Sequence, residues 1–384
     1  MTEFFVLHKN KRTVLIREEN FLKKGVKMGL NKPLLFALSD TKPGPKNLIT
    51  DVAGITVGHK TVVTDRLRTG VTVINPCPDN IFREKMPAAA HVINGFGKST
   101  GLIQVNELGT IETPLVLTNT LSVGTASMAL VKRMLAENPE IGLSTGSVNP
   151  IIMECNDSSI NHIRDLGVTE NDVNDAYAAA ATDFAEGGVG GGTGMRCYEL
   201  KGGIGSASRQ VEIDGKTFTM GALVMSNFGL STDLNIYGHA IGKKFVDNKD
   251  SKEKGSIITI IAADIPFNSR QLKRIAKRSG IGITRSGSFS GNGSGEITLA
   301  FSTANRVSHF PDHELSTIQA ITDDKIDRYF RITVDIVHEA ILSSLAHAQT
   351  TPDRDGKPML CLKDALLQLG DDKEALQLIA DLGL

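Results

Sequence analysis

Short apolar runs recur along the chain from about residue 48, and most of them are bounded by Gly, Asn or Pro. Runs of this length that are rich in Val, Ile and Thr are typical of β-strands, and the bounding residues are typical of turns. The pattern predicts strands at 49–59, 69–76, 89–95, 114–120, 221–229, 256–264 and 296–304. The run at 256–264 is almost wholly apolar, which predicts a buried strand.

Other segments carry apolar residues at helical spacing, and they predict helices at 123–138, 169–188, 268–280 and 323–349. Thr169 with Asp172 can cap the second of these helices. Asn268 or Ser269 can cap the third, which we expect to stop at Gly280. Helices alternate with groups of consecutive strands. We therefore expect an α+β fold with sheets packed face to face and helices outside, instead of an alternating doubly wound sheet.

The composition limits the classes of partner. The 42 basic and 43 acidic residues give a formal net charge of −1, so no basic excess favours nucleic acid or a membrane surface. The chain has no Trp and only 5% aromatic residues, which argues against a stacking platform for single strands. No apolar stretch approaches the length of a membrane span.

The four cysteines are far apart in the sequence, so we expect neither a disulfide framework nor a zinc knuckle. We expect a reducing, cytoplasmic location. Residues 1–45 are predicted to form a poorly ordered N-terminal extension, and residues 46–384 one domain. The 384 residues are enough to bury a large core.

Two glycine-rich segments resemble nucleotide-binding loops without matching them. In the first, at 95–100, Val92 stands where a phosphate loop needs its first Gly, and we interpret this segment as a turn. In the second, at 186–195, Met195 stands where a dinucleotide loop needs its last Gly, and we expect a loop close to another backbone or to a site. His309 and His313 flank a proline and cannot share a helix face. The sequence therefore predicts no cofactor and no metal.

The composition of the chain changes from charged to apolar at Gly255. A charged segment at 243–254, expected to be exposed, ends there, and Ser256 begins the apolar run. Cleavage between Gly255 and Ser256 would give the serine a free α-amine with a pKa near ~8, which can act as a base for its own hydroxyl nucleophile. A turn that joins a solvated loop to a strand needs no such chemistry, and the dipeptide alone does not choose between the two interpretations.

Four other residues carry candidate chemistry. Ser294 and Glu296 would share one face of a strand, where a hydroxyl beside a carboxylate can transfer a proton. Glu154 follows a short apolar run, and a carboxylate at a strand end can hold an ammonium group. Asn227 ends a predicted strand, where its amide can donate to an oxyanion. For each of them a polar turn or cap is the alternative interpretation.

Taken together, these segments resemble one family. The runs ITDVAGITVGH, PLVLTNT, NPIIMECND, EGGVGGGTGM, MSNFG, GSIITIIAADIP and GNGSGEITLAFSTAN are similar, in this order, to the DmpA family of L-aminopeptidase/D-esterases and β-peptidyl aminopeptidases. The resemblance covers roughly residues 47–345. It implies a four-layer αββα fold that resembles the N-terminal-nucleophile hydrolases but has its own strand connectivity.

The resemblance also implies roles for the candidate residues. Gly255–Ser256 matches the processing bond and Ser256 the nucleophile, so the mature enzyme would consist of an α part, 1–255, and a β part, 256–384. Ser294 and Glu296 match the buried pair beside the nucleophile, Asn227 the oxyanion donor, and Glu154 the carboxylate that receives the substrate's amine. Some relatives carry an aromatic residue where this chain has Asn156, so their specificity does not transfer.

The implied activity is hydrolysis of peptides, amino-acid amides or esters that have a free amine, by a homotetramer of αβ units. One alternative is an acyltransferase of the ornithine acetyltransferase type, which also cuts itself, but before Thr. Another is a non-catalytic relative on the same fold.

Overall fold

The computed structural model describes residues 37–245, 253 and 255–384 of the chain. Two β-sheets lie at its centre. The first has the strand order β1-β2-β5-β6, and only β5 and β6 in it are parallel. The second has the order β13-β3-β12-β11-β10-β9, with β4 paired to β3, and only β11 and β12 in it are parallel.

The bounds of these strands follow from their hydrogen-bonded ladders. In the first sheet they are β1 (Thr56–Val63), β2 (Arg68–Asn75), β5 (Leu115–Asn119) and β6 (Ile151–Cys155). In the second they are β3 (Glu84–Gly95), β4 (Thr110–Ile111), β9 (Gly203–Ile213), β10 (Lys216–Asn227), β11 (Ser256–Ala263), β12 (Gly295–Ser302) and β13 (Val307–Ser308). Two short hairpins lie outside the sheets, β7 (Arg196–Cys197) with β8 (Leu200–Lys201) and β14 (Thr351–Pro352) with β15 (Pro358–Met359).

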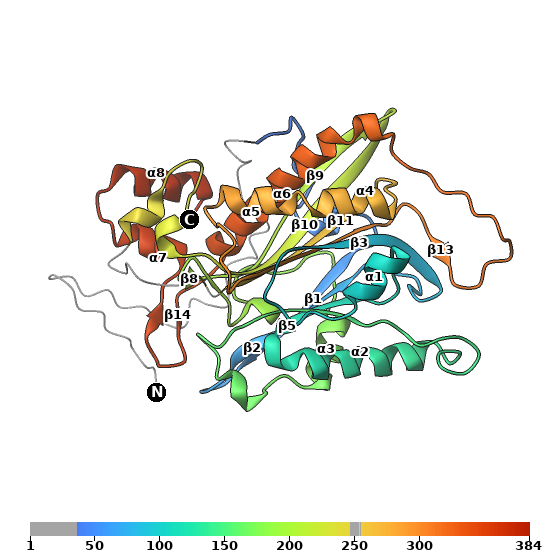
Figure 1. Ribbon diagram of the computed structural model, residues 1–384. Helices are drawn as coiled ribbons and strands as arrows, with labels where there is room; N and C mark the ends of the chain where they lie inside the picture. Colours follow the sequence, from blue (N-terminus) through green and yellow to red (C-terminus); the bar gives the residue numbers. More distant parts are fainter. Residues whose placement is uncertain (1–36, 246–252, 254) are drawn as a thin grey trace.

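Helices cover the outer face of each sheet (Figure 1). Helices α2 (Val123–Glu137) and α3 (Glu170–Ala178) pack on the first sheet, and α4 (Ser269–Ala276), α5 (Ser279–Arg285) and α6 (Asp327–Ala346) lie on the side of the second. The remaining helices are α1 (Leu102–Leu108), α7 (Leu362–Leu367) and α8 (Lys373–Leu382). The four layers confirm the predicted αββα arrangement. Within the described ranges, no helix combines the length and apolar composition that crossing a membrane requires.

Strand β11 explains why one run of the sequence is apolar at nearly every position. Ile258 and Ile260 belong to the hydrophobic core between the two sheets, whereas Ile257 and Ile261 belong to the core beneath α4 and α6. All eight residues of the strand are buried. A central strand with no solvated face needs apolar side chains on both sides, as in buried parallel sheets.

Two helix predictions need correction at their ends, although their predicted caps at Thr169 and Asn268 are confirmed. The helix expected at 169–188 ends at Ala178, because Ala181 turns away and exchanges two backbone hydrogen bonds with Val57 of β1. The helix at 268–280 ends at Ala276, and Gly280 lies inside α5. Gly280 does not have a positive φ, so it cannot act as the expected left-handed stop.

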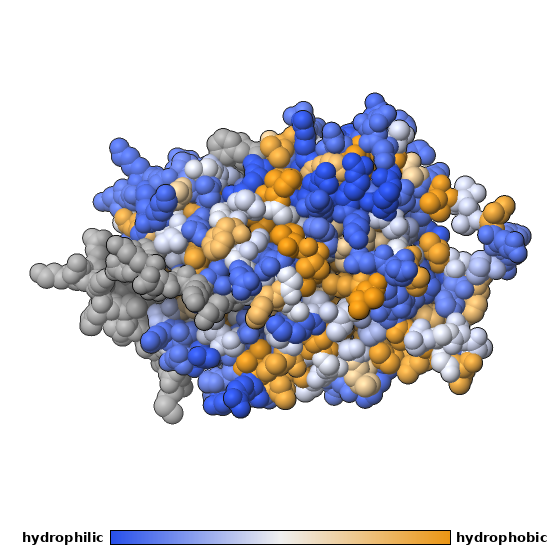
Figure 2. Space-filling view, viewed as in Figure 1, coloured by the Kyte–Doolittle hydropathy of each residue, from blue (hydrophilic) through white to orange (hydrophobic). Residues whose placement is uncertain are grey.

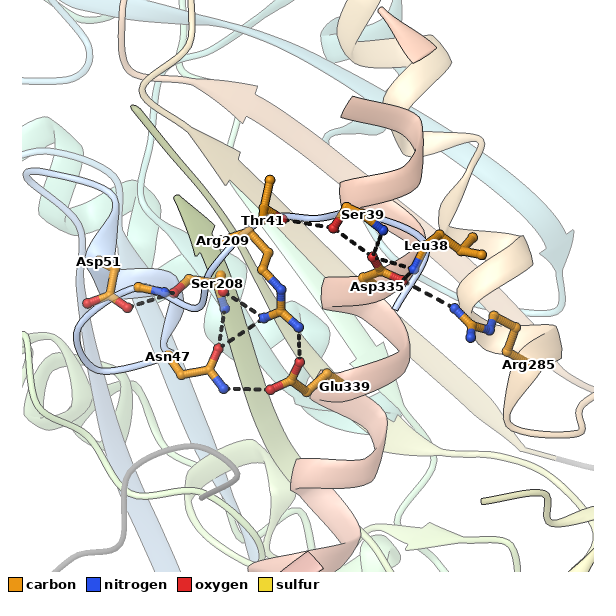
Figure 3. Close-up of polar contacts among 11 residues, drawn as sticks. Leu38, Ser39, Thr41, Asn47, Asp51, Ser208, Arg209, Arg285, Asp335 and Glu339 are labelled. Carbon is orange, nitrogen blue, oxygen red and sulfur yellow. Dashed lines mark hydrogen bonds and ion pairs between the residues drawn. The ribbon is translucent and has the colours of Figure 1, made fainter. Parts of the chain in front are cut away.

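A buried polar cluster ties the beginning of the described chain to α6 (Figure 3). Glu339 of α6 is fully buried; it pairs with Arg209 of β9 and accepts a 2.6 Å hydrogen bond from the Asn47 amide. Asp335, one turn earlier, accepts hydrogen bonds from the backbone of Leu38 and Ser39. A buried charge is tolerated only when it is paired and hydrogen-bonded, and here both conditions are met.

The predicted N-terminal extension covers residues 1–45. Residues 1–36 lie outside the described residues. Among the others, Leu38 and Ser39 bind Asp335, and the Lys42 carbonyl accepts a hydrogen bond from the backbone of Gln210. The folded part of the chain therefore begins before residue 46.

Candidate active site

Ser256 is the first residue of β11 and lies between two strands that carry other candidate residues. Its partner across the antiparallel ladder is Asn227, the last residue of β10. Its partner across the parallel ladder is Gly295, the first residue of β12. Ser294 and Glu296 flank that glycine. The ends of three neighbouring strands therefore bring together residues that lie up to about 70 positions apart in the sequence.

The peptide bond before Ser256 is held from several sides. The Gly255 carbonyl oxygen accepts a hydrogen bond from the Gly295 N–H at 3.2 Å and another from the Ser256 hydroxyl at 2.7 Å. A Cβ at position 255 would stand 2.4 Å from both the Asn227 carbonyl oxygen and the Phe228 Cα. Only glycine fits this close approach of two backbones, so the residue type before Ser256 is fixed by packing.

Ser294 and Glu296 form a buried pair, as their spacing predicts. The Ser294 hydroxyl donates to Glu296 Oε1 at 2.5 Å, and both residues have no solvent exposure. Glu296 Oε2 makes no hydrogen bond to any described residue. Burial, with a smaller contribution from the charge of Glu253, raises the pKa of the Glu296 carboxyl to about 7. A carboxyl group in this range can both take and give a proton near neutral pH.

The Asn227 side-chain amide is fixed beside Ser256. Its oxygen accepts the Arg196 N–H at 2.8 Å, and its nitrogen donates to the Asn156 carbonyl at 3.0 Å. The NH₂ group has two hydrogens, so one donor remains after this bond. Because the side-chain oxygen already accepts the Arg196 N–H, the orientation of the amide is fixed. The remaining N–H can then donate to an oxyanion.

Glu154 lies within β6 and not after it, and it is 3% exposed. One carboxylate oxygen accepts the Lys98 backbone N–H at 2.7 Å, and the other accepts the Thr120 hydroxyl. Two neutral donors and no described cation contact this carboxylate, so its charge is available for a cationic group.

The loop at 95–100 connects Glu154 with Ser256. Gly97 in this loop lies against Ile297 and Glu154. A Cβ added at Gly295 would meet both the Phe96 carbonyl oxygen, at 2.6 Å, and the Ser256 hydroxyl, at 3.2 Å. The segment predicted to be a turn is an irregular loop that runs from the end of β3 to an isolated bridge between Thr100 and Ile152. Its contact with Glu154 was not predictable, because a backbone N–H carries no sequence signal.

The structure therefore places all the predicted residues at or near one end of β11. It also adds residues that no sequence pattern singles out. Thr120 and Lys98 hold Glu154, and Glu253 lies buried two positions before Gly255. Glu253 belongs to the charged segment that we expected to be exposed, so that expectation is wrong for this residue.

Two sheets packed between helices, with a serine at the first residue of a central strand, define the N-terminal-nucleophile type of hydrolase. The sequence profile of peptidase family S58 matches residues 47–359. The chain belongs to this family.

Two kinds of relative support the assignment. A β-peptidyl aminopeptidase from Sphingosinicella microcystinivorans is 33% identical over 353 residues, which cover 85% of this chain and 88% of that protein. The L-aminopeptidase D-Ala-esterase/amidase of Ochrobactrum anthropi, described as a prototype of the serine aminopeptidases and a variant of the N-terminal-nucleophile fold, superposes with a TM-score of 0.79 at 34% identity. This match covers 87% of this chain and 97% of that one.

A crystal structure of a protein from Pyrococcus horikoshii OT3 is similar with a TM-score of 0.81 and 47% identity, over 90% of this chain and 96% of that one. The comparisons confirm the expected family resemblance and the fold class. They make the chain a hydrolase of the aminopeptidase class and do not favour the acyltransferase alternative.

Proposed function

We propose that the chain cuts itself between Gly255 and Ser256, and that the new N-terminal serine is the nucleophile of an aminopeptidase. One observation carries the proposal. The Gly255 carbonyl is hydrogen-bonded by the Gly295 N–H and by the Ser256 hydroxyl, at the point where Asn227, Ser294 and Glu296 converge. The parts would be 1–255 and 256–384.

Self-cleavage begins with attack of Ser256 Oγ on the Gly255 carbonyl carbon through a five-membered ring. The hydroxyl proton is transferred to the peptide nitrogen as the C–N bond breaks, which leaves an ester on Oγ and a free α-amine on Ser256. The Gly295 N–H stabilises the oxyanion in this step. Water then hydrolyses the ester, which returns the hydroxyl and gives Gly255 a terminal carboxylate.

The same groups serve substrate hydrolysis. Glu154 holds the substrate's free ammonium group, and Ser256 Oγ attacks the first carbonyl. Its proton is transferred to the leaving group through the α-amine or through Glu296 with Ser294. Asn227 and a backbone N–H stabilise the oxyanion, at about 3 kcal/mol per donor. Water hydrolyses the acyl-enzyme and releases one amino acid.

The names of the relatives point to the substrate class. One relative is named a β-peptidyl aminopeptidase and another an L-aminopeptidase D-Ala-esterase/amidase, and these names together denote peptides, amides and esters cleaved at an amino-terminal residue. We propose this class for the present chain. Small peptides, amino-acid amides and amino-acid esters all belong to it, and nucleic acids and membranes are not among its proposed partners.

Replacing the proposed nucleophile tests this function. Ser256→Ala removes Oγ, so we expect an uncut chain whose kcat/KM for aminoacyl p-nitroanilides falls by at least about 10⁴-fold, in the range seen when nucleophiles are deleted. Ser308→Ala, at an exposed position of β13, is the control and should remain active. Hydrolysis by Ser256→Ala at the wild-type rate would refute the assignment.

We also propose a homo-oligomer, a tetramer of αβ units by family resemblance. Large apolar side chains are exposed on and near α1 and α2, and Ile103 is 90% and Leu143 87% exposed. Figure 2 shows hydrophobic patches among hydrophilic ones on the face drawn there. Contiguous apolar surface often marks an interface. Light scattering should give about four times the 41.2 kDa chain mass, and a monomer would contradict the proposal.

A cytoplasmic location remains a proposal as well. All four cysteines are buried and unpaired, as in a reducing compartment. Fractionation of the source cells, with an activity assay of each fraction, tests this proposal. Activity in the cytoplasmic fraction supports it, and activity in another fraction contradicts it.

A further inference from the structure

Glu253 is a buried carboxylate that the proposed chemistry does not use. Its exposed fraction is 6%, although its sequence neighbours are charged. One oxygen accepts the Gly229 N–H at 3.0 Å, and the other accepts the Gly291 N–H at 2.7 Å. The Ser288 hydroxyl lies 3.4 Å from the first oxygen. Among the described residues no Lys or Arg pairs with it, so two backbone N–H groups and one hydroxyl offset the cost of burying it.

The two backbone donors lie on the two elements that carry the active-site groups. Gly229 follows β10 two residues after Asn227. Gly291 begins the turn that leads to Ser294, and the Ser294 N–H closes this turn on the Gly291 carbonyl at 2.9 Å. The Asn94 side chain donates to the same carbonyl at 3.0 Å. The Glu253 carboxylate therefore connects the loop after β10 to the turn before β12. Glu253 itself lies two residues before Gly255, at the bond proposed to be cut.

Gly291 is shaped to receive this carboxylate. A Cβ added there would stand 2.7 Å from Glu253 Oε2, so a side chain at position 291 would displace the carboxylate. Gly229 has a φ of +86° and presents its N–H from a turn that favours glycine. Both donors are thus held in turns whose geometry permits the approach of the carboxylate.

We propose that Glu253 is a positioning residue for self-cleavage. It anchors the backbone two residues before Gly255, so that the Gly255 carbonyl stays against the Gly295 N–H and within reach of Ser256 Oγ. It touches none of the reacting atoms. The inference rests on the proposed self-cleavage and deepens it. Reaction within a held geometry is faster because the entropy of alignment is already lost, and small misplacements are costly.

This role predicts a separation between two rates. Cleavage removes the covalent connection between Glu253 and Ser256, so loss of the carboxylate should slow processing. Hydrolysis by processed chains should be unchanged at a pH where Glu296 is ionised with or without the charge of Glu253. A purely structural role would lower both rates, or would lower the melting temperature without a selective effect on processing.

The test uses full-length Glu253→Ala, Glu253→Gln and wild type, with processing followed by intact mass after a pulse of synthesis. We expect Glu253→Ala to be cut about 10- to 100-fold more slowly. Hydrolysis is compared at about pH 9, well above the pKa of Glu296, so that the lost charge of Glu253 does not change the ionisation of that carboxyl group, and kcat/KM per cut chain should stay within about twofold of wild type. Glu253→Gln keeps the shape and one acceptor oxygen, and should be intermediate.

Glu199→Ala is the matched control. Its carboxylate accepts the Ser231 hydroxyl at 2.6 Å and so also holds a loop, without a contact to the processing bond. We expect this variant to be cut at the wild-type rate.

Wild-type processing of Glu253→Ala or, if that variant does not fold, of Glu253→Gln would overturn the proposal. So would a loss of kcat/KM per cut chain that equals the loss in processing rate. If the wild-type chain itself is never cut, self-cleavage is refuted and this inference fails with it. If the wild-type chain is cut and Glu253→Ala is cut equally fast, only the role of Glu253 is refuted.

Discussion

Glu296 is a buried carboxyl group whose ionisation changes near neutral pH. Burial raises its pKa to about 7 from the usual 4.5, so the folded state holds a proton that the unfolded state loses between these pH values. The folded state is therefore favoured at low pH, and this contribution is lost as the pH rises through 7. The proton-transfer role and the stability cost have the same origin, which is burial of a carboxyl group without a cation.

Glu296→Gln should remove this pH dependence. We expect its free energy of unfolding, relative to the parent, to be higher at pH 8 than at pH 5 by about 1 to 3 kcal/mol, since each unit of pKa shift corresponds to about 1.4 kcal/mol. Urea unfolding at both pH values, in the uncut Ser256→Ala chain, measures this difference. Glu107→Gln, at an exposed position of α1, is the control. An equal change for both variants would contradict the account.

At the scale of single residues, the sequence predicts a side-chain contact when the two partners lie close together along the chain. Ser294 and Glu296 are two positions apart, and alternation along a strand was enough to place them together. The partners of Glu154 and Glu253 are backbone N–H groups or distant hydroxyls. Such donors are present in every loop, so only the fold shows which of them meet a carboxylate.

At the scale of elements, a strand and a loop together build the site proposed to bind the substrate's amine. Strand β6 supplies Glu154, and the loop at 95–100 supplies the Lys98 N–H that orients it. This carboxylate has two neutral donors and no described cation as a partner, so a substrate's ammonium group would bring it an opposite charge. Its contribution should therefore depend on the charge of the substrate's amine.

Glu154→Ala should reduce kcat/KM about 10- to 100-fold for substrates with a free amine, which corresponds to a charged hydrogen bond of 1.5–3 kcal/mol. N-acylated analogues of the same substrates should lose much less. Glu154→Gln keeps oxygen and shape but removes the charge, and should show the same selectivity. Kinetics on paired free and acylated substrates measure it, and equal losses on both would remove the amine-binding role.

The helices show where sequence patterns fail at this scale. Capping residues at Thr169 and Asn268 were predicted correctly because a cap is a local interaction. The helix ends were wrong where a tertiary contact decided them. Ala181 pairs with β1 despite the high helix propensity of its alanine-rich surroundings, and Gly280 continues as helix in α5.

At the scale of the whole molecule, the class of fold was predictable and the strand order was not. Consecutive strands with few helices between them indicated packed sheets, and the family resemblance supplied the four layers. The pairing of β3 with β12 joins segments about 200 residues apart, and no local pattern contains that information. The other edge of β12 pairs with β11, and this parallel ladder brings Ser294 and Glu296 beside Ser256.

The central claim is that one bond in this chain is cut by the residue that follows it. The intact mass and N-terminal sequence of the purified protein test it most directly. The account predicts two fragments of about two-thirds and one-third of the 41.2 kDa chain, with the smaller beginning Ser-Ile-Ile-Thr at Ser256. A single uncut chain, folded and stable, or a new N-terminus at any other residue, would contradict it.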